Sequence, residues 1–349
     1  MPALAKGAGQ GYLGFMAKVQ DWLKATPGGL VCEPGGFTID PTAPVDRAVV
    51  THGHGDHARP GSTHVLATSG TIEIMRTRFG PEAGASLQPL DYGDWLELSG
   101  VKLAFAPAGH VLGSAQVVME YGGQRVVVSG DYKRRPDPTC TPFEPVGCDL
   151  FITEATFGLP VFRHPDDAGE IAKLLESLRL FPERTHLVGA YALGKAQRVM
   201  ALLRRAGWER PICLHGALFP LTDLYRRLGQ GFGELKPATG ASKAELKGEI
   251  VLAPPGALRE AWSRRMAEPM RAIASGWMGV RARARQAGAE LPLVISDHAD
   301  WDELTATIRE VGASEIWVTH GREEALVHYA QGLGIKARAL AMLGYDDEE

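Results

Sequence analysis

Long apolar runs are scarce in this sequence of 349 residues. Gly, Pro or a charged residue interrupts each run within about ten residues, well short of the roughly 18 that a membrane span needs. We therefore expect a soluble protein with no membrane segment. The glycine-rich start, Met1–Met16, lacks a compact apolar core, so we predict a flexible leader there rather than a signal peptide.

Cysteine and excess positive charge are scarce as well. The four cysteines form no C-x-x-C pair, which excludes a disulfide framework or a thiolate zinc knuckle and favours the reducing cytoplasm. The 37 Lys and Arg against 41 Asp and Glu give a formal net charge of −4. A globally basic chain is thereby excluded, so any nucleic-acid binding has to come from a local patch.

What is present is a mixed pattern of strands and helices. In the first half, Gly and Pro separate short β-branched runs, and from Pro165 helices and strands alternate. Near Leu291 the β pattern returns. We predict strands at Gly36–Asp40, Arg47–Thr51, Val101–Pro107, Ala115–Tyr121, Arg125–Ser129, Leu150–Thr153, Thr185–Ala190 and Pro211–His215, in P-L-V-I-S before Asp297 and in E-I-W-V-T before His320. We predict helices at Asp166–Leu180, Lys195–Ala206 and Asp302–Val311, a hairpin turn at Tyr121–Gln124, and a solvated acidic end at Asp346–Glu349.

The strongest local signal is T-H-G-H-G-D-H at Thr51–His57, directly after an apolar strand. In an extended or tightly looped segment, His52 and His54 can point to one metal ion, while Asp56 and His57 turn toward a second. The intervening glycines allow the close backbone approach that such a loop needs. The alternative is a histidine-rich surface loop that binds no metal.

Three more residues of metal-binding type follow predicted strands: His110, Asp131 and His320. Strand ends are where a sheet presents a site. Imidazoles and carboxylates without thiolates suit Zn²⁺, Mn²⁺ or Fe²⁺, and we favour zinc or manganese. A shared carboxylate would hold two ions about 3.5–4 Å apart, the spacing used in phosphoryl displacement.

These motifs carry a resemblance to a known family. H-G-H-G-D-H is similar to the H-x-H-x-D-H signature of the metallo-β-lactamase fold, and F-T-I-D, A-G-H-V-L-G-S-A and S-G-D-Y resemble its other motifs. T-E-A-T-F-G with Glu154, S-D-H-A-D with His298 and V-T-H-G with His320 resemble motifs A, B and C of the β-CASP nucleases. The resemblance implies an α/β fold: an αββα sandwich from residues 1–165 and 289–349, with a compact α/β cap inserted at 166–288.

The resemblance also implies a ligand set. It assigns His52, His54 and His110 to one divalent metal, Asp56, His57 and His320 to the other, and Asp131 to both. Asp40 would hydrogen-bond a ligand or the loop without binding metal itself.

Within the β-CASP subgroup, C-E-P-G-G-F-T-I-D-P, P-D-P-T-C-T-P-F-E-P and S-D-H-A-D-W resemble the bacterial ligase-associated DNA exonucleases. This implies DNA as substrate, a role in DNA repair, and functional association with an ATP-dependent DNA ligase and a helicase. The histidine at motif C, His320, resembles the RNA-processing members instead, so RNA stays an alternative substrate. A non-catalytic nucleic-acid scaffold and a small-molecule metallo-hydrolase are further alternatives.

The expected chemistry is phosphodiester hydrolysis, in which a metal-bridging hydroxide attacks phosphorus. We assign protonation of the leaving oxygen to His298, and we expect Glu154 to orient it and favour its charged form. For substrate contact we predict Lys133 and Arg134 after Asp131, Lys195 at a helix start, and Arg281 and Arg283. The two arginines belong to a strip at Gly256–Gly288 that has seven arginines against two glutamates. The competing interpretation of this strip is a solvated helix face.

Overall fold

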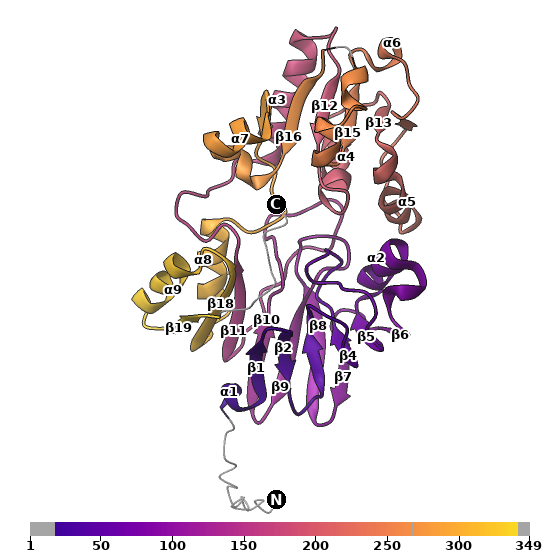
Figure 1. Ribbon diagram of the computed structural model, residues 1–349. Helices are drawn as coiled ribbons and strands as arrows, with labels where there is room; N and C mark the ends of the chain where they lie inside the picture. Colours follow the sequence, from indigo (N-terminus) through magenta and orange to yellow (C-terminus); the bar gives the residue numbers. More distant parts are fainter. Residues whose placement is uncertain (1–17, 267, 341–349) are drawn as a thin grey trace, which may run out of the picture.

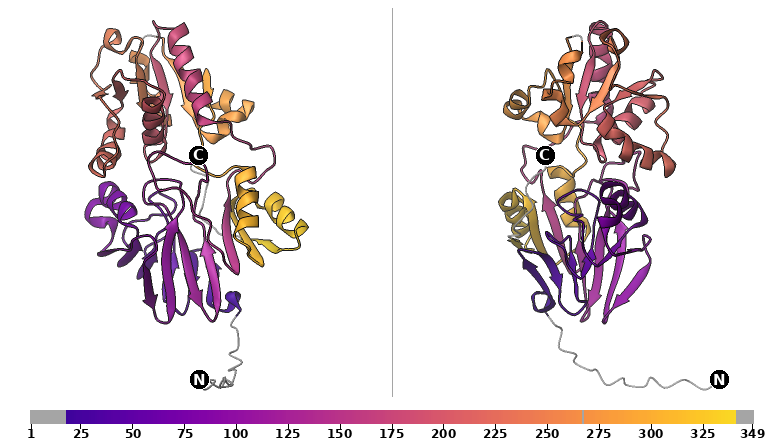
Figure 2. Two further views of the ribbon diagram at one scale, coloured as in Figure 1. Left: turned by 180° about the vertical axis from the view of Figure 1, so that it is seen from behind. Right: turned by 45° about the vertical axis from the view of Figure 1, so that its right-hand side comes forward.

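The computed structural model describes residues 18–266 and 268–340 and consists of two lobes (Figure 1). The lower lobe contains two β-sheets and the upper lobe a third, and the upper lobe lies above the lower one in all three views (Figures 1 and 2). The predicted leader and the predicted acidic end lie outside the described residues. No helix in the described part of the chain combines the length and apolar character that crossing a membrane requires.

The first sheet of the lower lobe contains the first six strands in sequence order. They are β1 (Leu23–Thr26), β2 (Gly29–Cys32), β3 (Phe37–Ile39), β4 (Arg47–Val49), β5 (His64–Ala67) and β6 (Ser86–Pro89), preceded by the short helix α1 (Val19–Trp22). From β3 onward the strands pair in parallel. The predicted strands at Gly36–Asp40 and Arg47–Thr51 are confirmed, each ending one or two residues earlier than expected.

The second sheet brings together distant parts of the sequence, in the order β19-β18-β11-β10-β9-β8-β7. Its strands are β7 (Trp95–Leu98), β8 (Val101–Pro107), β9 (Ala115–Tyr121), β10 (Gln124–Val128), β11 (Leu150–Ala155), β18 (Glu315–Gly321) and β19 (Lys336–Ala339). The predicted hairpin turn between β9 and β10 is confirmed, with positive φ at Gly122 and Gly123. Because β18 pairs in parallel with β11, the chain that leaves the lobe after β11 returns beside it.

The two sheets pack face to face around an apolar core. Phe37, Ile39 and Val49 of the first sheet meet Phe105 and Trp317 of the second in one buried cluster. Burial of such side chains is the main favourable term in folding. Helix α2 (Ser69–Phe79) covers the outer face of the first sheet, and α8 (Trp301–Glu310) and α9 (Glu323–Gly332) cover that of the second. This is the predicted αββα sandwich.

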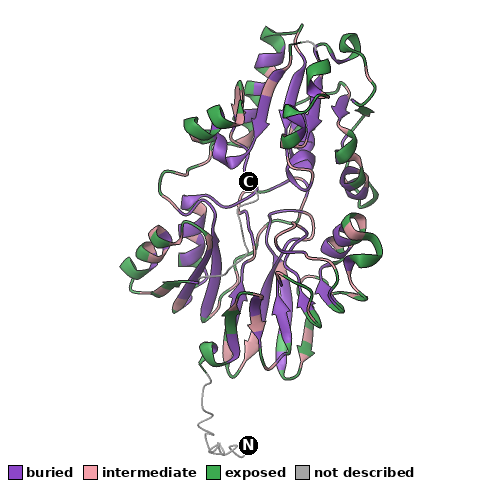
Figure 3. Cartoon of the chain, in the orientation of Figure 1, coloured by how far each residue is buried: buried purple, intermediate pink, exposed green. Residues whose placement is uncertain are grey.

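The third sheet forms the upper lobe and is parallel throughout, in the order β14-β13-β15-β12-β16-β17. Its strands are β12 (His186–Gly189), β13 (Ile212–Leu214), β14 (Leu235–Pro237), β15 (Ile250–Ala253), β16 (Met270–Ala274) and β17 (Leu291–Leu293). The central strands β12 and β15 are buried along their whole length, as Figure 3 shows, because helices and turns cover both faces.

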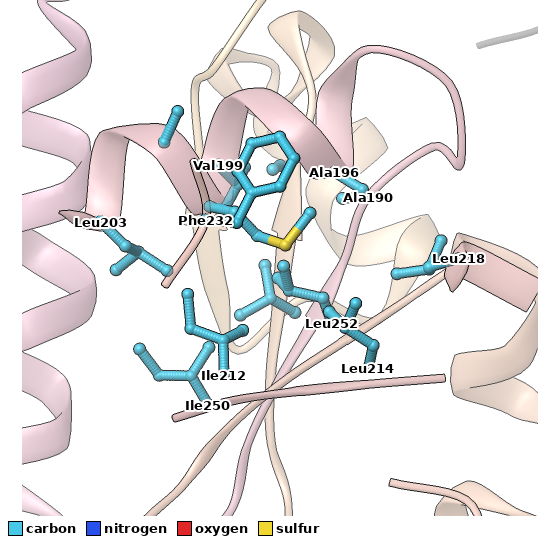
Figure 4. Packing of buried hydrophobic residues seen from close by; sticks show 14 of the residues in the cluster. Ala190, Ala196, Val199, Leu203, Ile212, Leu214, Leu218, Phe232, Ile250 and Leu252 are labelled. Atoms are coloured by element: carbon cyan, nitrogen blue, oxygen red, sulfur yellow. The ribbon is translucent and has the colours of Figure 1, made fainter. Parts of the chain in front are cut away.

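Three helices cover one face of this sheet: α3 (Asp167–Leu180), α4 (Lys195–Arg205) and α5 (Phe219–Arg227). Figure 4 shows Val199 and Leu203 of α4 packed with Ile212, Leu252 and other strand residues. The other face is covered by α6 (Lys243–Leu246), α7 (Arg281–Ala287) and short 3-10 turns. The helices predicted at Asp166–Leu180 and Lys195–Ala206 are confirmed to within one residue.

The strand predicted in P-L-V-I-S is shorter than expected. It ends at Leu293, and residues 294–298 follow as an irregular segment. The reason is that β17 lies at the sheet edge and pairs only with β16, which itself ends at Ala274. The backbone N–H of Val294 therefore donates to the Glu170 carboxylate and that of Ile295 to the Leu293 carbonyl oxygen. Residues 294–298 do not continue the strand pairing.

The two lobes are joined through the start of α4. Arg198 on this helix is fully buried and pairs with two carboxylates, Asp137 after the lower-lobe strand β10 and Asp167 at the start of α3. The Nη1 atom of Arg198 lies 2.8 Å from Asp137 Oδ2. Ile74 of α2 packs into the core of the upper lobe, so apolar contact supports the same junction.

We predict that Arg198→Ala lowers the free energy of unfolding by about 3–5 kcal/mol, because it leaves two carboxylates at the junction without their cation. Urea unfolding followed by circular dichroism measures this. Arg205→Ala is the matched control, since Arg205 is exposed on the same helix. Equal stability of the two variants would show that the buried pair does not hold the junction.

Candidate metal centre and active site

The loop Thr51–His57 is fixed by Asp40 at the end of β3. The Asp40 carboxylate accepts hydrogen bonds from the Thr51 backbone N–H at 2.8 Å and the Thr51 hydroxyl at 2.6 Å. It also lies 2.7 Å from His57 Nδ1. Asp40 has a φ of 44°, which is unusual for a residue with a side chain and turns its carboxylate beneath the loop. The predicted supporting role of Asp40 agrees with this geometry.

Among the described residues, His52, His54, His110 and Asp131 form the first of four overlapping groups of atoms that could hold a metal ion, and two of the other groups include His298. His54 Nδ1 lies 3.1 Å from His52 Nε2 and 2.9 Å from His110 Nε2. Asp131 Oδ2 lies 3.5 Å from His52 Nε2 and 3.8 Å from His110 Nε2. His52 and His54 follow β4 of the first sheet, whereas His110 comes from the loop between β8 and β9 and Asp131 follows β10, all in the second sheet. Strand ends of both sheets therefore meet here.

His57, Asp131 and His320 form the second group and share Asp131 with the first. His57 Nε2 lies 3.5 Å from Asp131 Oδ2 and 3.4 Å from Asp56 Oδ2. His320 Nδ1 lies 3.8 Å from Asp131 Oδ1. His320 sits near the end of β18 with a φ of 57°, a left-handed conformation within the strand. All seven residues predicted as ligands are thus close together.

The protonation of three of the imidazoles suits metal binding, whereas nearby carboxylates, Asp56 first, outweigh burial and raise the pKa of His57 well above its usual value. Burial lowers the pKa of His110 to about 3 and that of His320 to about 4, and it lowers the pKa of His52 well below its usual value. These imidazoles are therefore neutral at pH 7 and keep a lone pair for a cation. Burial acts to raise the pKa of Asp131, but the neighbouring histidines, His57 first, outweigh it and hold that pKa well below its usual value.

The donor set fits a divalent metal ion. Asp131 Oδ1 is buried and accepts no hydrogen bond from any described residue. Such an orphaned carboxylate oxygen is costly unless a cation satisfies it. Imidazole nitrogens and carboxylate oxygens without thiolate are the ligands of Zn²⁺ or Mn²⁺ sites. Because Asp131 belongs to both groups, the cluster could hold two ions on either side of it.

Outer contacts orient two of the imidazoles, one from the segment after β17 that leaves the upper lobe and one from the loop between β12 and α4 within it. His110 Nδ1 lies 2.8 Å from the Asp297 carbonyl oxygen, and His54 Nε2 lies 3.3 Å from the Leu193 carbonyl oxygen. When each ring donates its N–H there, its other nitrogen faces the cluster as a lone pair. Gly194 makes this approach possible, because a Cβ at that position would lie 2.4 Å from Val111 Cγ1.

His298 and Glu154 form a buried pair beside the cluster. His298 Nδ1 lies 2.9 Å and 3.2 Å from the two carboxylate oxygens of Glu154. Glu154, in β11, also accepts hydrogen bonds from the Tyr132 backbone N–H and the Thr156 hydroxyl, and burial raises the pKa of its carboxyl group. The His298 ring lies 4.6 Å from the His110 ring, centroid to centroid. The pair can therefore exchange a proton next to a bound substrate.

The two lysines predicted to contact substrate lie beneath the site rather than on its surface. Lys133 Nζ donates to the Ser296 carbonyl oxygen at 2.6 Å, and Lys195 Nζ lies 2.6 Å from Asp297 Oδ1. Both side chains are fully buried. This burial contradicts the predicted substrate contact. Both lysines instead contact the segment 295–298 that carries His298, a geometry that suits positioning of this segment.

The predicted arginines make their contacts outside the ligand groups. Arg134 pairs with Glu310 at 2.7 Å on the lower lobe, Arg281 is exposed at the start of α7, and Arg283 stacks on Trp277. Sequence reasoning missed Leu193 and Asp297. Asp297 could have been found as a polar residue beside His298, but Leu193 acts through its backbone carbonyl and leaves no signal in the side-chain pattern.

Comparison with known proteins agrees with this geometry. Residues 41–189 match the metallo-beta-lactamase superfamily. The chain is 30% identical over 324 residues to a "Probable DNA ligase" of Opitutus terrae, covering 89% of this chain but only 30% of that protein. It is 28% identical over 391 residues to a ribonuclease of Thermus thermophilus, covering 89% of both chains. An endoribonuclease of Kluyveromyces lactis is 33% identical over 121 residues, which is 34% of this chain and 16% of that one.

A crystal structure of a protein of unknown function from Enterococcus faecalis has the same fold, with a TM-score of 0.51 and 13% identity over 86% of this chain and 80% of that one. Residues 41–189 therefore match the metallo-beta-lactamase superfamily, and the relatives named as nucleases support the β-CASP subgroup expected from the motifs. These similarities and the ligand cluster support the predicted class, a metal-dependent hydrolase.

We predict that Lys195→Met weakens divalent metal binding by about 10–100-fold, the usual effect of losing a residue that orients a metal ligand. Without the Lys195 ammonium, the Asp297 carboxylate is buried without its cation, and the segment whose carbonyl orients His110 shifts. Competition with a chromophoric chelator measures the affinity for Zn²⁺ and Mn²⁺. Arg205→Met on the exposed side of α4 is the control. Unchanged affinity in Lys195→Met, with a folded circular dichroism spectrum, would contradict the positioning role.

Proposed function

We propose that the protein is a two-metal phosphodiesterase that acts as a DNA exonuclease in DNA repair. The observation that carries this proposal is the double ligand cluster around Asp131 with the His298–Glu154 pair beside it. The similarity of nearly the whole chain to one segment of a protein named as a probable DNA ligase supports a role next to strand joining. On this basis we propose DNA as substrate and functional association with an ATP-dependent DNA ligase and a helicase in the cytoplasm.

The ligands would hold two divalent metal ions, and both ions would be Zn²⁺ or both Mn²⁺. His52, His54 and His110 would hold one, Asp56, His57 and His320 the other, and Asp131 both. When bound, such a pair of ions activates water at neutral pH and polarises the phosphoryl oxygen. Asp40 keeps the loop that supplies four of these ligands in place through Thr51 and His57.

His298 would protonate the leaving oxygen. Its Nδ1 atom is held by Glu154, so the Nε2 atom is the one that can reach a substrate. Glu154 is itself fixed by two hydrogen bonds and stabilises the charged imidazole. This pair distinguishes the proposed nuclease from a small-molecule metallo-hydrolase, and the complete ligand set argues against a non-catalytic scaffold.

An RNA nuclease is the second candidate. The relative that matches this chain over 89% of both lengths is named a ribonuclease, and another is named an endoribonuclease. His320 at the third β-CASP motif is the residue type expected in RNA-processing members. The metal centre would act on the phosphodiester of either polymer.

Digestion of end-labelled oligonucleotides tests the proposal directly. We expect stepwise shortening of DNA with Mn²⁺ or Zn²⁺, abolished by a chelator and slower on RNA of matched sequence. Labelling the two ends in turn gives the direction of digestion. Preferential cleavage of RNA would favour the second candidate, and no cleavage of either polymer would reject the nuclease proposal.

Two variants separate metal binding from proton transfer. We predict that Asp131→Ala abolishes nuclease activity with loss of metal, while His298→Ala lowers it by about 10²–10⁴-fold and keeps the metal. Metal content by atomic emission spectroscopy distinguishes them. Bis(p-nitrophenyl) phosphate, whose leaving group needs no proton, should be hydrolysed by His298→Ala far better than an oligonucleotide is. If His298→Ala digested DNA at nearly the wild-type rate, His298 would not be the general acid.

A further inference from the structure

A pocket separate from the metal-ligand cluster lies in the upper lobe, at the carboxyl edge of the third sheet. Its walls follow the ends of β12, β15 and β16, at Tyr191, Pro255 and Ser275, and its volume is about 370 Å³. In open α/β sheets, small ligands bind beyond the carboxyl ends of parallel strands. The volume is at the lower end of the range of about 300–1,000 Å³ for small-molecule sites, which suits one nucleotide.

Two guanidinium groups line this pocket, those of Arg259 and Arg283. They belong to the strip of seven arginines at residues 256–288, and none of the seven has an ion-pair partner among the described residues. Other arginines of the same lobe do pair with carboxylates, as Arg184 does with Glu290 at 2.8 Å. The pocket therefore sits in a local excess of positive charge, although the chain carries a formal net charge of −4.

Both guanidinium groups are held in place. Arg283 lies over the ring of Trp277, with its Cζ atom 3.8 Å from the ring centroid. Trp277 is buried and packs on Phe157 at 4.7 Å, so it gives the guanidinium a rigid surface. Arg259 Nη2 donates to the Gln286 carbonyl oxygen at 2.9 Å. Fixed guanidinium groups with N–H donors to spare are typical of phosphate sites.

The pocket also offers an aromatic wall and polar groups. Tyr191 is half-buried and lines it, and Ser275 and Gln286 lie on the same walls. Aromatic rings stack on nucleobases in single-strand binding sites, and this contact tolerates any base. Phosphate-binding cations and a stacking ring in one pocket of this size match a nucleotide.

This pocket is close to the metal centre. Phe157 contacts Trp277 at one side and lies 6.2 Å from the His298 ring at the other, centroid to centroid. Tyr191 is two residues before Leu193, whose carbonyl oxygen contacts the ligand His54. We propose that the pocket binds one nucleotide of the substrate strand near the bond that is cut, its phosphate at Arg259 and Arg283 and its base on Tyr191. This assignment rests on the proposed nuclease function.

Binding of 5′-dAMP to the protein in excess chelator tests the pocket without the metal centre. Isothermal titration should show that Arg259→Gln and Arg283→Gln each raise the Kd by about tenfold. Arg285→Gln is the matched control, since Arg285 is exposed on α7 and is not among the lining residues. We expect it to keep the wild-type Kd, and deoxyadenosine without phosphate to bind at least tenfold more weakly. If all three variants raised the Kd equally, or if Arg283→Gln left the Kd unchanged, the nucleotide-binding proposal would be wrong.

A comparison of two substrates separates this proposal from the proposed function. In Arg283→Gln, kcat/KM should fall by about tenfold more for an oligonucleotide than for bis(p-nitrophenyl) phosphate, which reports on the metal centre. If the wild type digests oligonucleotides while Arg283→Gln shows no such difference, the pocket assignment is wrong and the nuclease stands. If 5′-dAMP binding depends on Arg259 and Arg283 but neither DNA nor RNA is cleaved, the pocket stands and the nuclease proposal is wrong.

Discussion

The buried carboxylate of Asp131 is the group around which the rest of the structure is arranged. A carboxylate loses several kcal/mol of hydration on burial, and only cations or hydrogen-bond donors compensate for that loss. Around Asp131 the nearest imidazole nitrogens lie 3.5–3.8 Å away, and one of its oxygens accepts no hydrogen bond from the described residues. Three of the surrounding histidines are held neutral by burial. The neighbouring carboxylates outweigh burial and hold the pKa of His57 well above its usual value, so His57 supplies compensating charge that a bound metal ion would replace.

Residues of the upper lobe contact the metal ligands and the segment beside them. The start of α4 carries three contacts within six residues: the Leu193 carbonyl on His54, Lys195 on Asp297, and Arg198 on Asp137. The first two orient ligands of one metal group, and the third joins the lobes. Because Lys195 and Arg198 and their carboxylate partners are buried and charged, moving the lobe would expose or unpair them. The orientation of α4 and the geometry of the metal ligands are therefore coupled.

The sequence predicted a set of ligand-type residues that lie close together in the structure, but it did not predict the buried contacts of Lys133 and Lys195 beside them. His52, His54 and Asp56 stand in one short motif, and the residue types alone indicate a metal. Lys133 and Lys195 resemble surface cations in the sequence, because their burial depends on a segment more than 100 residues away. The early end of β17 likewise depends on how far its only neighbour, β16, extends. Local patterns fix residue types and elements, whereas contacts between the lobes decide which charges are buried.

In the proposed nuclease, the metal centre and the upper lobe would contact different parts of the substrate. In the proposed function, the ligands around Asp131 and the His298–Glu154 pair would act on the phosphodiester, which DNA and RNA share. Discrimination between the two polymers has to come from groups that reach the sugar or the base. In the described chain, Tyr191, Ser275 and Gln286 line the pocket beside the site, and they come from the upper lobe. Substitutions in that lobe can therefore change the preferred polymer while the chemistry at Asp131 stays the same.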